Sequence, residues 1–225
     1  MPLVELIQKQ AGEIPVYAAY DCQYRVYGAY KQAGYTTETM TLFFCMKNIL
    51  PGTASIVHGR CVIGKNGFAG MNGYMPFDVS REELIKRIAD THGLSYMVTM
   101  IASVITILNP DEMIFGGNVV DQDMLDQIKA RCEAVIPPKF LPVFRMVTDN
   151  ECDYLEGMYQ MALELKVNIE VWALSNKIKK QVLLRFTVCV DAQKGLLFFM
   201  QTYKTAKDVE KKLDFAAILT SIIKI

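Results

Sequence analysis

"SIVHGRCVIGKNGFAGMNGYM", residues 55–75, joins a predicted β-hairpin to a glycine-rich loop. The first part is rich in β-branched and apolar residues and turns at His58-Gly59, as a hairpin does. The loop that follows, residues 64–75, has four glycines in twelve positions and a single charged side chain, Lys65. Such a loop brings backbone close to something, which is either a ligand or a neighbouring part of the same chain. The pattern leaves both open.

Predicted helices and strands alternate on both sides of this segment. Before it come a helix over 23–32, which Gly34 ends, and a strand over 41–46. A helix with Ser80 as N-cap and Glu83 in a capping box, closed by Gly93, comes after it. The other predicted elements are helix 3–11, strand 16–20, an apolar and therefore buried helix 94–110, strand 112–117, helix 121–135, strand 144–148 and helix 153–166. This order predicts an α/β fold in which helices cover a sheet.

The character of the chain changes after Lys166. Segments 181–190 and 195–200 are typical of a hairpin, and a charged helix from about Tyr203 leads into the apolar end "FAAILTSIIKI". We expect a domain over residues 1–166 and a C-terminal α+β extension over 167–225, which packs on the domain or in an interface.

Composition narrows the class of protein. Hydrophobic residues make up 52% of the 225, enough for a buried core, and 24 basic residues balance 24 acidic ones without a basic patch, which argues against nucleic-acid binding. The chain shows no secretory signal and no apolar run of membrane-spanning length, so we expect a cytoplasmic protein. Six dispersed cysteines without a CxxC pair indicate reduced thiols rather than a metal or disulfide framework.

Four segments, in order, resemble one family. "IPVYAAYDCQ", "SIVHGRCVIGKNGFAGMNGYM", "ILNPDEMIFGGNVV" and "YLEGMYQMAL" are similar to the sugar box, hairpin and glycine loop, Gly-Gly turn and closing helix of the ROK proteins. These are bacterial sugar kinases and sugar-responsive repressors. The resemblance runs from about residue 3 to about 166. It implies an actin-like ATPase (ribonuclease H-like) domain and phosphoryl transfer from ATP to a sugar hydroxyl.

In the family one carboxylate accepts the proton of the sugar hydroxyl, and the resemblance places Asp21 at that position. The alternative role for Asp21 is to cap the helix that follows. Tyr20 stands where the family has a sugar-binding Asn.

The glycine loop keeps the family scaffold but changes two polar positions. The family Glu corresponds to Met71, and the His corresponds to Tyr74. A thioether is a poor partner for sugar hydroxyls, so the resemblance leaves Asn66, Gly67, Asn72 and Tyr74, together with Tyr20, as the substrate-binding positions. The alternative is a turn whose glycines only allow tight packing.

The resemblance implies ATP and Mg²⁺ as cofactors, with Gly116 and Gly117 against the adenosine. An ordinary strand-to-helix connection would also explain these glycines. The family's phosphate turn corresponds to "KNILPG", residues 47–52, where Pro51 has no N–H to offer. We expect no zinc, because Tyr74 and a cysteine-free helix replace the family ligands.

These departures predict a ROK-type sugar kinase-like protein with impaired or no ATP-dependent sugar phosphorylation as a lone chain. If active, it would be a hexose or N-acetylhexosamine kinase. The alternatives are a non-catalytic sugar-sensing or regulatory protein and a decayed gene product without a specific role. The resemblance makes a sugar the expected ligand. The family's Asp-x-Gly-Gly-Thr half has no counterpart here, so a separately encoded N-terminal half is one expected partner. A homodimer is the other.

Overall fold

The computed structural model describes residues 3–11, 19–90, 93–147, 152–162, 185–191 and 196–202. They fall in two compact units, one of residues Ala19–Met161 and one of Met1–Ala18 with Ala162–Ile225. The predicted domain boundary after residue 166 stays a prediction. No helix in the described ranges is long and apolar enough to cross a membrane.

The unit Ala19–Met161 is built on a mixed five-stranded sheet of order β3-β2-β1-β4-β5. β1 pairs antiparallel with β2 and parallel with β4, β2 pairs antiparallel with β3, and β4 pairs parallel with β5. The strands are β1 Thr39–Cys45, β2 Gly52–Val57, β3 Arg60–Cys61, β4 Glu112–Gly117 and β5 Val143–Met146. His58 and Gly59 both have positive φ, of 48° and 75°, as a two-residue hairpin turn requires. The hairpin prediction is therefore confirmed.

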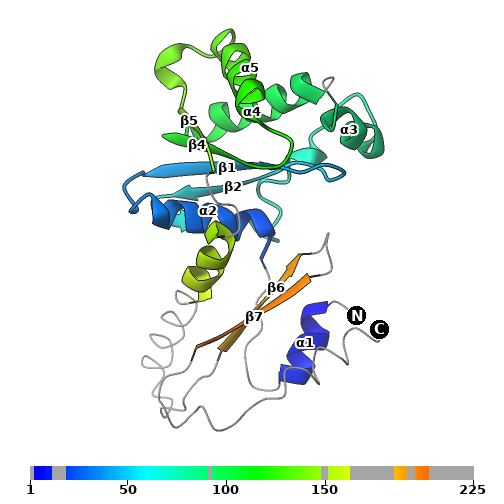
Figure 1. The fold of residues 1–225 in the computed structure, drawn as a ribbon, viewed down its shortest axis with the longest axis vertical. Helices are drawn as coiled ribbons and strands as arrows, with labels where there is room; N and C mark the ends of the chain where they lie inside the picture. Colours follow the sequence, from blue (N-terminus) through cyan, green and yellow to red (C-terminus); the bar gives the residue numbers. More distant parts are fainter. Residues whose placement is uncertain are drawn as a thin grey trace. The chain divides into compact units, whose positions relative to one another are not determined.

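Helices cover both faces of this sheet (Figure 1). Helix α2, Asp21–Gln32, and helix 152–162 lie on one face. Helices α3 Arg81–Ile88, α4 Leu94–Leu108 and α5 Gln122–Glu133 lie on the other. Short 3-10 turns occur at η1, Asn72–Tyr74, and η3, Pro138–Phe140. The predicted α/β class, a sheet flanked by helices, is confirmed.

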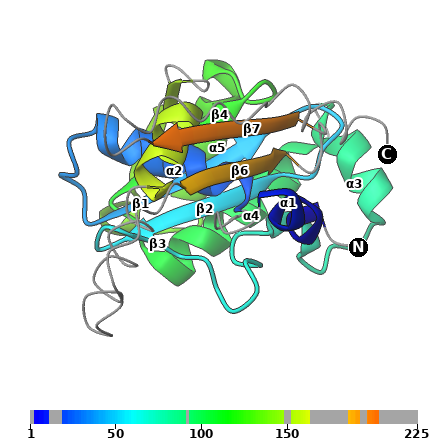
Figure 2. The ribbon, with the colours of Figure 1, turned by 90° about the horizontal axis from the view of Figure 1, so that it is seen from below.

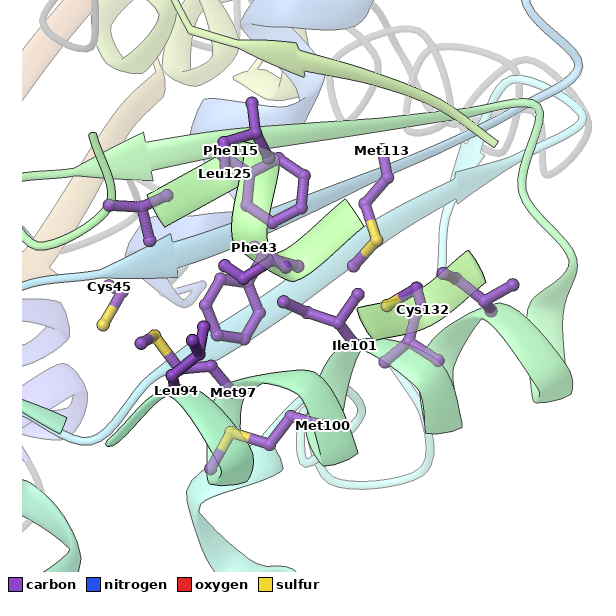
Figure 3. Packing of buried hydrophobic residues seen from close by; sticks show 14 of the residues in the cluster. Phe43, Cys45, Leu94, Met97, Met100, Ile101, Met113, Phe115, Leu125 and Cys132 are labelled. Atoms are coloured by element: carbon purple, nitrogen blue, oxygen red, sulfur yellow. The ribbon is translucent and has the colours of Figure 1, made fainter. Parts of the chain in front are cut away.

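The larger core fills the space between the sheet and α3, α4 and α5. Phe43 of β1 and Phe115 of β4 are fully buried, and their ring centroids are 5.9 Å apart. Figure 3 shows both rings facing α4, where Met97 and Ile101 complete the contact. A second cluster of Val26, Tyr27, Leu42 and Ile56, among others, lies under α2.

Helix α2 and helix 152–162 pack with glycine against backbone. A Cβ on Gly28 would lie 1.9 Å from the carbonyl oxygen of Asp153, and one on Gly157 would lie 1.7 Å from that of Tyr24. Any side chain at either glycine would therefore force the helices apart. The Tyr24 and Tyr154 rings meet edge to face beside this contact, with centroids 6.0 Å apart.

Two details of the predicted helices were wrong. Helix α3 ends at Ile88 instead of running to Gly93, which has φ −79° and precedes α4. Glycine is needed there because a Cβ would lie 2.3 Å from the Cα of Ile88, where the chain passes close to α3. Helix α4 is not buried all round, since Ile107 is 79% exposed and the buried residues lie along one side.

The other unit contributes helix α1, Leu3–Ala11, and an antiparallel pair, β6 Arg185–Asp191 and β7 Leu196–Thr202 (Figure 2). The predicted helix 3–11 and the predicted hairpin are confirmed. The predicted helix after Tyr203 lies outside the described residues. So does most of the predicted strand 16–20, although Ala19 and Tyr20 are described and belong to no strand.

Candidate functional site

The glycine-rich loop, residues 64–75, is fixed to strand β2 through the carbonyl of Gly70. That oxygen accepts hydrogen bonds from the N–H groups of Thr53, at 2.7 Å, and Asn72, at 2.8 Å. Gly70 has φ +87°, and a Cβ there would lie 1.9 Å from the carbonyl oxygen of Thr53. The glycine therefore allows two backbone segments to meet, and these contacts define the shape of the loop.

Asn72 belongs to this attachment, because its side chain is only 8% exposed. Its Oδ1 lies 3.1 Å from the hydroxyl of Thr53, and its Nδ2 is buried without a hydrogen-bond partner. A sugar contact through the Asn72 side chain would therefore require the loop to open. The tight-packing alternative describes this part of the loop well.

The outer surface of the loop is aromatic. Phe68 is 56% exposed and Tyr74 48%, and their rings meet edge to face with centroids 5.3 Å apart. The guanidinium carbon of Arg81, the first residue of α3, lies 4.0 Å from the centre of the Tyr74 ring. Asn66 is also exposed on this loop. The sequence did not single out Phe68 and Arg81, although a phenylalanine inside a glycine loop is an unusual choice.

Tyr20 joins the loop to the start of helix α2. A Cβ on Gly67 would lie 3.2 Å from a ring carbon of Tyr20, so the ring lies against this glycine. Next to Tyr20 in the chain, the Cys22 sulfur lies 3.2 Å from a Cβ built on Gly52, the first residue of β2. The first turn of α2, the loop and the start of β2 therefore meet at one edge of the sheet.

Asp21 is the first residue of α2, and an ion pair holds its carboxylate. Arg25 Nε lies 3.0 Å from each Asp21 oxygen, and the guanidinium carbon lies 4.5 Å from the centre of the Phe44 ring. The arginine side chain is 10% exposed and the aspartate 23%. The N-cap is Tyr20, whose N–H donates to Gln23 Oε1 at 3.2 Å, so the alternative that Asp21 caps this helix was wrong.

Gly116 and Gly117 end β4 beside the carboxyl end of β1, in register with Phe44 and Cys45. Gly117 has φ +105°, and a Cβ there would lie 1.9 Å from the carbonyl oxygen of Cys45. Its freedom is used for close packing against β1, as in an ordinary connection. Burial raises the pKa of the Cys45 thiol to about 12, so this cysteine stays protonated and unreactive.

The turn between β1 and β2, residues 46–51, does not fit a phosphate group. The Lys47 N–H donates to Asn118 Oδ1 at 2.9 Å, and the Ile49 N–H donates to the carbonyl oxygen of Met46 at 3.4 Å. Pro51 has no N–H and is buried. A phosphate cradle needs several N–H groups pointing outward, and here two of them already have protein acceptors and Pro51 has none. In the described ranges no three His, Cys, Asp or Glu side chains gather as a metal site would require.

The same turn contacts the glycine loop. The Gly73 N–H donates to the carbonyl oxygen of Pro51 at 3.3 Å, and a Cβ on Gly73 would lie 2.6 Å from that of Leu50. The structure thus gathers Tyr20, the loop and the turn at the edge where β1 and β4 end. Ligands of open α/β sheets bind at the carboxyl ends of the strands. This edge offers aromatic faces and exposed polar groups, whereas the turn at residues 46–51 offers few backbone N–H groups to cradle a phosphate.

No protein-family model matches the sequence, and no curated protein matches it. Solved structures do resemble the fold. A ROK hexokinase from Thermus thermophilus matches with a TM-score of 0.51 and 14% identity, over 69% of this chain and 67% of the hexokinase. A ROK family protein from Streptococcus pneumoniae, in complex with sucrose, matches with a TM-score of 0.52 and 14% identity. That match covers 72% of this chain and 70% of the S. pneumoniae protein.

A ROK family transcriptional regulator, a homologue of the Escherichia coli Mlc protein, has a TM-score of 0.52 at 16% identity. That match covers 70% of this chain and 55% of the regulator. At such identities the likeness concerns the fold alone, and it is shared by kinases and a regulator. The chain has the actin-like fold of the ROK proteins, and the fold prediction is confirmed.

Proposed function

We propose that this chain, which has the ROK fold, is a sugar kinase-like protein that binds a sugar at the glycine loop and transfers phosphate from ATP weakly or not at all. The observation that carries the proposal is the meeting of Tyr20, the glycine loop and the β1–β2 turn at one edge of the sheet. The ROK protein from S. pneumoniae whose fold this chain shares was solved with a sugar, sucrose. In this proposal Asn66, the backbone at Gly67 and the hydroxyls of Tyr20 and Tyr74 contact the sugar.

The ion pair of Asp21 supports weak transfer. A general base must reach the hydroxyl proton, and Arg25 Nε already lies 3.0 Å from both carboxylate oxygens of Asp21. Asp21 would act only if a bound sugar displaced or shared this contact.

The nucleotide side supports the same conclusion. ATP with Mg²⁺ would supply the phosphoryl group, and Gly116 and Gly117 would lie against the adenosine. The turn at residues 47–51 would have to break its hydrogen bonds from Lys47 and Ile49 before it could face a phosphate. We assign no step of the reaction to this turn.

Isothermal titration against hexoses and N-acetylhexosamines, with and without ATP-Mg²⁺, tests the proposal. A coupled ADP-release assay on the same samples measures turnover. We expect binding of at least one sugar and turnover near background. Robust turnover that Asp21→Asn abolishes, and that Asp126→Asn on helix α5 leaves unchanged, would contradict the weak-transfer part. If no sugar binds, the whole proposal fails.

A second candidate is a non-catalytic sugar-sensing or regulatory protein. The match to a ROK transcriptional regulator, with a TM-score of 0.52, favours it as much as the hexokinase match, with 0.51, favours a kinase. A sensor should change its association state when sugar binds. Light scattering with and without the sugar found by titration separates the two, and also tests for the homodimer. Co-expression with a separately encoded N-terminal half tests the other expected partner.

A further inference from the structure

The charges around the glycine loop are one-sided. Between Cys61 and Phe77 the only charged side chain is Lys65, and the sequence there contains no carboxylate. The second cation is Arg81, stacked on Tyr74 at 4.0 Å. Both Lys65 and Arg81 are exposed.

Neither cation forms an ion pair within the described ranges. Arg81 contacts the Tyr74 ring but makes no hydrogen bond or ion pair to a described residue, and Lys65 makes none either. A guanidinium that stacks through its face keeps its N–H edge available for an oxyanion. The cation of Arg81 therefore lies beside the aromatic surface, ordered by Tyr74 and unpaired.

The nearest acids in the sequence have partners of their own. Asp78 accepts a hydrogen bond from the hydroxyl of Tyr96 at 3.3 Å, and Glu83 accepts one from Arg87 Nε at 2.8 Å. Hydrogen bonds from its own backbone and from Ser80, with a smaller attraction to Arg81, lower the pKa of Glu82, so its charge is directed mainly at the start of α3. None of these acids forms an ion pair with Arg81.

The same surface carries aromatic side chains. Phe68 and Tyr74 are both about half exposed and hold each other edge to face, and Tyr20 lies at the other side of the loop against Gly67. Aromatic faces suit the C–H face of a pyranose ring, and a site of this kind needs only a few polar groups to fix orientation. The loop therefore offers a stacking face together with a cation.

We propose that the glycine loop selects a pyranose that bears a negatively charged substituent, with the ring against Phe68 and Tyr74 and the anion on Arg81. The substituent is a carboxylate or a phosphate, and the chemistry of the cation is the same for both. This inference rests on the proposed function, because it names the class of sugar for the same site. A neutral hexose would leave Arg81 without an ion-pair partner.

Titration of the full chain with glucose, glucuronate, glucose 6-phosphate and inorganic phosphate, at low and at moderate salt, tests the inference. For an exposed ion pair we expect at least one charged sugar to bind about three- to fivefold more tightly than glucose at low salt, and the preference to shrink as salt rises. The ranking of glucuronate against glucose 6-phosphate identifies the anion.

Arg81→Gln should remove this preference, so that the charged sugars bind no more tightly than glucose does to the same variant. The matched control is Arg131→Gln, which removes an exposed arginine from helix α5 and should keep the preference. Arg81→Lys should restore part of it, which separates loss of charge from misfolding of the loop.

Equal affinity for glucose and both charged sugars overturns this inference and leaves the proposed function standing. Inorganic phosphate binding as tightly as glucose 6-phosphate also overturns it, because the ring would then contribute nothing. If none of the sugars binds, the proposed function fails together with the inference.

Discussion

Replacing Gly70 by alanine tests whether the loop is held to β2 by backbone contact. The new Cβ would lie 1.9 Å from the carbonyl oxygen of Thr53, and φ at this position is +87°. The matched control is Gly64→Ala, which has a similar φ of +72° but meets its nearest atom, the Ala69 Cβ, at 3.3 Å. The two variants share the backbone strain and differ in the collision.

The magnitude follows from that difference. The left-handed conformation costs an alanine about 1 kcal/mol in both variants, partly offset by the lower entropy of the unfolded chain. Relief of the collision at Gly70 must in addition break the hydrogen bond from the Thr53 N–H, which spans 2.7 Å and would leave buried groups unpaired at about 1 to 3 kcal/mol. We expect Gly70→Ala to cost about 2 to 4 kcal/mol and Gly64→Ala about 1 kcal/mol or less.

Hydrogen exchange at the Thr53 amide measures the effect locally, which suits a chain with two compact units, because global unfolding need not be two-state. Protection at Thr53 should fall by at least tenfold in Gly70→Ala and little in Gly64→Ala. Urea titration supplies the overall free energy of unfolding. Equal protection of the Thr53 amide in the two variants would refute the backbone-contact argument. Losses of unfolding free energy that differ by less than about 0.5 kcal/mol between the two variants would refute it as well.

Three other outcomes are expected. Burial raises the pKa of Cys132 to about 11 and that of Cys45 to about 12. At pH 8 an alkylating reagent should therefore label exposed Cys152 long before either buried thiol, which peptide mass spectrometry would measure. Ser80→Ala removes the cap that accepts the Glu83 N–H at 3.2 Å and should lower the unfolding free energy in urea by about 1 kcal/mol. The ion pair with Lys31 of α2 lowers the pKa of Glu156 in the folded protein. The pair therefore stabilises the fold at pH values above the pKa of an unfolded glutamate, about 4.3, and this stabilisation is lost as pH falls through the lower pKa of the folded state. Glu156→Gln should flatten the fall in unfolding free energy over that acid range.

Each of these has a control. Labelling of Cys45 in the folded protein at the rate of Cys152 would show that the core opens readily. Ser95→Ala, at an exposed position in the first turn of α4, should leave stability within about 0.5 kcal/mol, and an equal loss there would remove the capping argument. Glu133 forms an exposed pair with Lys129 at 3.9 Å. Glu133→Gln should therefore keep the fall in unfolding free energy at acid pH that Glu156→Gln flattens.

Local patterns predicted most of the fold. Strand 112–117 and helix 3–11 were placed at their observed bounds, because both are marked by apolar spacing, and Gly116-Gly117 close the strand while a glycine follows the helix. Gly93 was misread because a glycine that ends a helix and one that admits a neighbouring backbone look the same in sequence. Only the position of Ile88 in space distinguishes them.

The site was harder to predict, because the roles of its residues depend on partners far along the chain or on the direction of a side chain. Asn72 was proposed as a sugar contact, whereas its burial against Thr53 depends on which way the loop folds. The Asp21–Arg25 pair lies at the spacing i, i+4 and could have been found as a helix ion pair. The stacking of Arg81 on Tyr74 joins two segments that no local pattern connects.

The glycine contact between α2 and helix 152–162 has a consequence for how the chain is made. Gly28 and Gly157 are 129 positions apart (157 − 28), yet each meets the backbone of the opposite helix. During synthesis at roughly 5 to 20 residues per second, α2 leaves the ribosome several seconds before its partner exists. Its glycine surface must wait uncovered for that time, and a nascent chain stalled before residue 157 should be cleaved by protease in α2, whereas one released after residue 162 should not.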